Sequence, residues 1–97
     1  MMSMRFDRFI TALTGMAVLR NQESKMIHYE VNYNDEYNLV RIVVSDTKSN
    51  RVGVVIMSQD EFNKNLETWN EKEIAERLLS IAFDKLLGQE KKWKGPN

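Results

Sequence analysis

The stretch that decides the fold is Leu39-Val40-Arg41-Ile42-Val43-Val44-Ser45, near the middle of a chain of 97 residues. It predicts a β-strand, because β-branched residues dominate it and it contains no glycine or proline. Its apolar side chains fall on both faces of that strand: Val40, Ile42 and Val44 on one, Leu39 and Val43 on the other. A half-exposed strand alternates apolar and polar residues, so this strand is expected to need cover on both faces.

Two further strands flank it. Residues 26–33 alternate, with Ile27, Tyr29, Val31 and Tyr33 on one face, and residues 51–57 hold a second β-branched run. The connections, 34–36 and 46–50, are short and rich in residues that favour turns. Such connections predict an antiparallel meander in which the strand over 37–45 is central.

Helices are predicted on either side of the strands. Apolar residues recur at helical spacing over 4–14, and Gly15 either ends this helix or lies within one that continues to about residue 20. Residues 21–24 are polar and predict a loop. Ser58 to Glu61 and Asn70 to Glu73 fit capping boxes, which predict a short helix and then a long one over 71–87 that ends at Gly88.

The predicted fold class is therefore α+β. It has two layers, a three-stranded antiparallel meander with an N-terminal helix and two C-terminal helices (α-β-β-β-α-α). The length fits one domain, predicted over residues 1–88, followed by a basic flexible tail over 89–97.

Composition excludes some classes of function. The chain has no cysteine, which removes disulfides, thiolate nucleophiles and cysteine-bound zinc. Its 14 basic and 14 acidic side chains cancel, whereas generic nucleic-acid binders carry a basic excess. The N-terminus does not have the pattern of a signal peptide, and no apolar run is long enough to span a bilayer. These features predict a cytoplasmic protein.

No catalytic, cofactor or metal site is predicted, and we therefore expect a protein that is not an enzyme. His28 is the single histidine, and a zinc site or a general base needs partners that the sequence does not offer beside it. The carboxylates follow no recognisable catalytic or calcium-binding spacing, and Glu61 and Glu73 already have capping roles. The four glycines are too scattered for a phosphate-binding loop.

The predicted function is protein–protein interaction, as a homodimer or as a small adaptor or inhibitor of another protein. Its basis is apolar surface in excess of what one copy can bury: a central strand apolar on both faces and a broad apolar face on the last helix. The tyrosines near the first hairpin suit an interface, because they bury area and keep a polar tip. The candidate interface residues are Tyr29, Tyr33, Tyr37, Leu39, Val43, Met57 and Trp93. Small size and several N-terminal methionines are also typical of phage or mobile-element accessory proteins.

The alternative function is that of a nucleic-acid-binding accessory protein. The segment 91–94 mixes three lysines with Trp93, so it could bind phosphates while the indole stacks on a base, or instead dock in a protein groove. The candidate phosphate-binding residues are Arg5, Arg8, Lys91, Lys92 and Lys94.

The order of elements over residues 4–88 resembles that of double-stranded-RNA-binding domains. That family contacts RNA through a glycine-proline-histidine strand loop and a lysine-rich start to its last helix. The corresponding segments here, 34–36 and 70–73, are acidic, and an additional short helix intervenes. The resemblance therefore implies the topology and does not carry RNA-binding residues to this chain.

Overall fold

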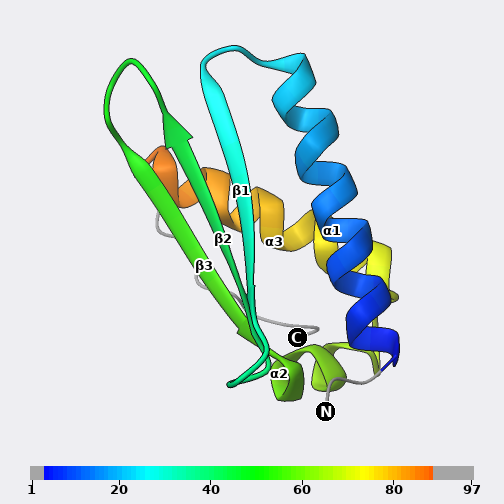
Figure 1. Cartoon of the computed structure of the whole chain (residues 1–97). Helices are drawn as coiled ribbons and strands as arrows, with labels where there is room; N and C mark the ends of the chain where they lie inside the picture. Colours follow the sequence, from blue (N-terminus) through cyan, green and yellow to red (C-terminus); the bar gives the residue numbers. More distant parts are fainter. Residues whose placement is uncertain (1–3, 89–97) are drawn as a thin grey trace.

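The computed structural model describes residues 4–88, shown in Figure 1. In chain order the elements are α1 (Met4–Glu23), β1 (Ile27–Asn34), β2 (Leu39–Asp46), β3 (Val52–Ser58), α2 (Gln59–Asn65) and α3 (Glu71–Leu86). This order confirms the predicted α+β fold. The predicted tail over 89–97 lies outside the described residues.

The three strands form one antiparallel sheet in the order β1-β2-β3, so β2 is central as its sequence predicts. Residues that share a row across the sheet share a face. The rows on the inner face are Tyr29–Val44–Gly53, Val31–Ile42–Val55 and Tyr33–Val40–Met57. The side chains of Val40, Ile42 and Val44 are fully buried there, which places the core against one face of β2.

Helices α1 and α3 cover that inner face. α1 packs on β1, α3 packs on β2 and β3, and the two helices contact each other, as Figure 1 shows. An aromatic cluster joins α1 to α2: Phe9 stacks on Phe62 with ring centroids 4.6 Å apart, and Phe6 contacts both rings. Five more large core side chains come from α1 and α3: Leu13, Ile74, Leu78, Leu79 and Leu86.

Gly53 allows α3 to lie unusually close to β3. A Cβ built at Gly53 would overlap the carbonyl oxygen of Ala82 and would lie 2.6 Å from the backbone nitrogen of Leu86. Because both atoms belong to the helix backbone, no side-chain rotation could relieve the contact. The crossing of α3 over the sheet therefore requires glycine at this position.

Both predicted capping boxes are present. The side chain of Ser58 accepts a hydrogen bond from the Glu61 N–H at the start of α2, and Asn70 does the same for Glu73 at the start of α3. In each box the glutamate side chain in turn accepts from the backbone N–H of the capping residue. After α3, Gly88 has a φ of +78°, the left-handed conformation of a helix terminator.

The structure decides between the two predicted endings of the first helix. α1 continues through Gly15 to Glu23, so the prediction of a loop over 21–24 is wrong for its first three residues. Glycine within a helix costs about 0.5–1 kcal/mol relative to alanine. That cost is offset because Ala17, further along the helix, is buried in the core and Asn21 bonds to the sheet.

Candidate interaction surface

The outer face of the sheet, opposite α1 and α3, is the candidate surface, and we call it the open face. It is defined by four cross-strand rows, here in the order β1, β2, β3: His28–Ser45–Val52, Glu30–Val43–Val54, Asn32–Arg41–Ile56 and Asn34–Leu39–Ser58. Its apolar residues gather toward β3 and its polar residues toward β1. The open face is thus divided along its length into an apolar side and a polar side.

The apolar side is exposed to solvent. Val52, Val54 and Ile56 follow one another along β3 with 54 %, 38 % and 53 % of their surface accessible. Leu39 and Val43 on β2 lie beside them and are half-buried. Scattered apolar residues are normal on protein surfaces, whereas large contiguous apolar patches are characteristic of interaction sites.

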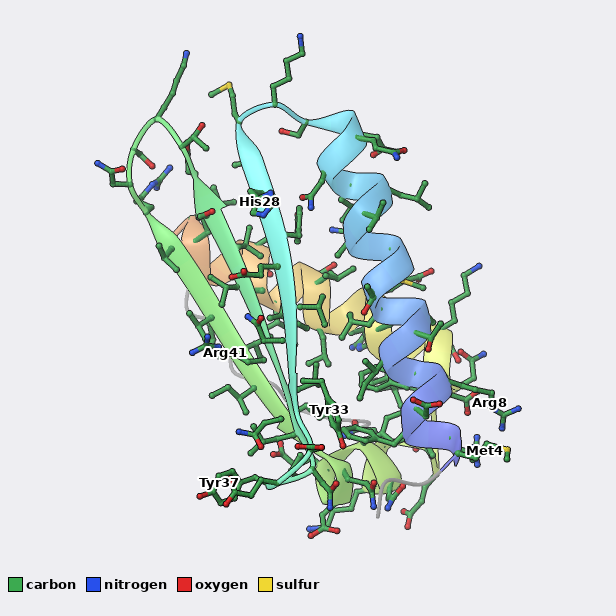
Figure 2. All side chains as sticks on the ribbon, viewed as in Figure 1. Met4, Arg8, His28, Tyr33, Tyr37 and Arg41 are labelled. Carbon is green, nitrogen blue, oxygen red and sulfur yellow. The ribbon has the colours of Figure 1, made fainter. Side chains whose placement is uncertain are left out.

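The polar side combines two opposite charges. Glu30 and Arg41 are exposed and occupy adjacent rows on adjacent strands. Neither forms an ion pair with another side chain within residues 4–88. Figure 2 shows Arg41 and His28 on the side of the sheet away from α3. A surface with one free charge of each sign can be complementary to itself.

One helix side chain bonds to the backbone at each edge of the sheet. The Asn21 side chain lies against the edge of β1, where its Oδ1 accepts from the Tyr29 N–H at 2.7 Å and its Nδ2 donates to the Tyr29 carbonyl at 2.9 Å. At the other edge, Lys85 Nζ donates to the Val54 carbonyl at 3.1 Å. Edge strands with free backbone groups invite pairing with another chain, and here those groups are engaged at one point on each edge.

The predicted interface residues do not lie together on one surface of the structure. Leu39 and Val43 lie on the open face, as their parity in β2 predicts. Tyr29 and Met57, at 7 % and 1 % exposure, lie in the core, so their side chains are unavailable to a partner in this conformation. They point inward because they share rows with Val44 and Val40.

The other tyrosines lie near the hairpin between β1 and β2. Tyr33 packs edge-on against Phe6, and its hydroxyl donates to Asn38 Oδ1 at 3.3 Å. Desolvation, followed by the charges of Asp35 and Asp7, raises the pKa of Tyr33, so its phenol stays neutral at physiological pH. Tyr37 is 66 % exposed and points away from the body of the molecule (Figure 2). Trp93 lies outside the described residues.

The residues missed by sequence reasoning are Val52, Val54 and Ile56, which are the most exposed apolar residues of the open face. The sequence feature that could have identified these residues as exposed is Gly53. A glycine inside a strand marks a close approach of another backbone, which assigns the Gly53 face to α3 and leaves Val52 and Val54 on the opposite face.

The candidate phosphate-binding residues do not form one cluster within residues 4–88. The Arg5 guanidinium pairs with the Glu71 carboxylate, with Nε 3.0 Å from Oε1. Arg8 is exposed on α1 and points away from the fold (Figure 2). Lys91, Lys92 and Lys94 lie outside the described residues, so nucleic-acid binding stays a prediction that depends on them.

A shallow groove lies between the start of α1 and the end of α2. Its lining residues are Met4, Arg5, Asn63, Leu66 and Glu67.

Within residues 4–88, no three histidine, aspartate or glutamate side chains come close enough together to hold a metal ion. The described helices also include none with the length and apolar character needed to cross a bilayer.

Comparisons of the chain with protein-family models, with curated proteins and with solved structures found no match.

Proposed function

We propose that this chain is a non-enzymatic protein–protein interaction module whose binding surface is the open face. The observation that carries the proposal is the exposed row of Val52, Val54 and Ile56 on a sheet whose other face is buried under two helices. At about 25 cal/mol per Å² of apolar area, covering such a row is a favourable driving force for association. The cytoplasmic location expected from the sequence belongs to the same proposal.

The second candidate site for a partner is the outer surface of α1, where Val18 and Leu19 are 49 % and 59 % exposed. These two residues are adjacent on one helix, whereas the open face contains five apolar residues on two strands. Interfaces combine a contiguous apolar patch with polar surroundings, and on the open face a contiguous apolar side lies next to a polar side. We therefore place the partner on the sheet.

The proposal can be tested with a photo-crosslinking amino acid in the full chain, placed at Ile56 or at Leu19 and activated in the native host. The two positions are matched, because their exposures are 53 % and 59 %. We expect a discrete adduct from position 56, identified by mass spectrometry as a second copy or as one other protein, and none from position 19. Equal yields at both positions, or no adduct at position 56, would contradict the proposal.

A further inference from the structure

We infer that the open face is covered by a second copy of this chain, packed face to face about a two-fold axis, with Glu30 of each copy paired to Arg41 of the other. This inference rests on the proposed function and names the partner. It follows from the helix side chains bonded to both sheet edges, from the arrangement of charge and from the layout of the rows.

The helix side chains bonded to the two edges favour stacking of sheets over extension of the sheet. A second chain that added a strand to β1 would have to displace the two hydrogen bonds between Asn21 and the backbone of Tyr29. One that added a strand to β3 would have to displace Lys85 from the Val54 carbonyl. The side chains of the open face need no such displacement, so two copies can meet there without rearrangement.

Charge on the open face is complementary to a second copy of itself. Glu30 and Arg41 are the formally charged side chains among the open-face residues, and they cancel. In a two-fold interface the same patch meets itself, so each contact occurs twice. A strongly charged foreign partner would leave one of these two groups facing a like charge, whereas a second copy can pair both.

The rows supply a specific geometry. The axis lies between the two sheets, runs across the strands, and passes midway between the row of Val43 and the row of Arg41. Each strand then stacks on its own copy, and Val54 faces Ile56 of the second copy. Glu30 comes to lie one strand to the side of Arg41 of the second copy, about 4.8 Å across the strands in sheets stacked about 10 Å apart, and the two long side chains together can span that separation.

The area of the face sets the strength of the dimer. Strands of 8, 8 and 7 residues cover a flat area of about 400 Å². A standard stable interface buries about 800 Å² on each partner. The dimer is therefore weak and depends on concentration, and the Glu30–Arg41 pairs contribute to its specificity.

The test is a charge exchange in the full-length chain, read by sedimentation equilibrium. Glu30→Arg and Arg41→Glu each place like charges opposite one another, and each should weaken dimerisation about tenfold or more. An equimolar mixture of the two variants should form heterodimers with about wild-type affinity, because every pair is then opposite in sign. Matched controls are Glu36→Arg in the hairpin and Arg8→Glu on α1, both exposed and off the open face, which should dimerise as wild type.

The outcomes separate this inference from the proposed function. If Ile56→Lys abolishes self-association but the charge variants and their mixture behave as wild type, the open face still binds protein but the paired arrangement is wrong. If wild type is a monomer and truncation after Gly88 makes it dimerise, residues 89–97 cover the face and the second copy is excluded. If wild type and the truncated chain are both monomers at every concentration, a second copy as the partner is also excluded. Crosslinking at Ile56 to a different protein would then retain the proposed function alone.

Discussion

Replacing Gly53 with alanine should destabilise the fold by forcing α3 away from the sheet. The new Cβ would overlap the Ala82 carbonyl oxygen and would lie 2.6 Å from the Leu86 nitrogen. Ordinary carbon contacts are about 3.5–4.0 Å, so the helix must move outward by about 1 Å or more. That shift would loosen the packing of fully buried residues such as Ile74 and Leu79.

The magnitude follows from two opposing effects. Alanine in a strand usually gains about 0.5–1 kcal/mol over glycine, because glycine loses more backbone entropy on folding. Overpacking in a core costs about 1–3 kcal/mol, and more where the obstructing atoms belong to the backbone. We expect a net loss of about 2–4 kcal/mol, which is a large part of the roughly 5–10 kcal/mol available to a domain of this size.

The assay is thermal or urea unfolding followed by circular dichroism, with Gly15→Ala as the matched control. Gly15 lies in α1, where an added Cβ would meet no atom within 4 Å, so alanine there should stabilise the protein by about 0.5–1 kcal/mol. Gly53→Ala should lower the midpoint by about 10–25 °C. If Gly53→Ala is as stable as wild type, then α3 does not cross β3 at this distance and the close packing of helix on strand is wrong.

Three further predictions concern hydrogen bonds. Asn21→Ala leaves the backbone N–H and carbonyl of Tyr29 unpaired, so we expect a loss of about 1–3 kcal/mol in urea unfolding and faster hydrogen exchange at the Tyr29 amide; unchanged exchange would refute the bridge. Asn70→Ala removes the cap of α3 and should cost about 1 kcal/mol in the same assay, while Asn70→Asp should retain most of the stability; equal loss in both would argue against the cap. The pKa of Asp46 is lowered, chiefly by the hydrogen bond from the Lys48 N–H. The ionised carboxylate therefore stabilises the fold at neutral pH, and this stabilisation is lost as the pH falls below about 4. Asp46→Ala should therefore be less stable than wild type at neutral pH, with a gap that narrows at acid pH; a gap that widens there would contradict the sign.

Sequence periodicity predicted the elements well because local physics determines them. The parity of β2 indicated its two faces, and the capping boxes at Ser58 and Asn70 indicated the starts of both C-terminal helices. The end of α1 could not be predicted in this way. It depends on contacts of Ala17 and Asn21 with parts of the chain outside the helix, and these outweigh the helix-weakening effect of Gly15.

The candidate surface was predicted less completely than the fold. Aromatic content pointed to the tyrosines, but Tyr29 shares a row with Val44 and therefore points into the core. The residues that do form the exposed patch are on β3, a strand that is apolar on both faces in sequence. Only the close crossing of α3 at Gly53 shows which of those faces is covered.

Whether two copies meet on the open face can be measured through the dilution dependence of backbone amide chemical shifts in the full-length protein. We expect shifts that change with concentration at Val43, Val54 and Ile56 and stay constant at Val18 and Leu19 on the outer side of α1. Shifts that are independent of concentration throughout, or that move on α1 and not on the sheet, would show that two copies do not meet on this face.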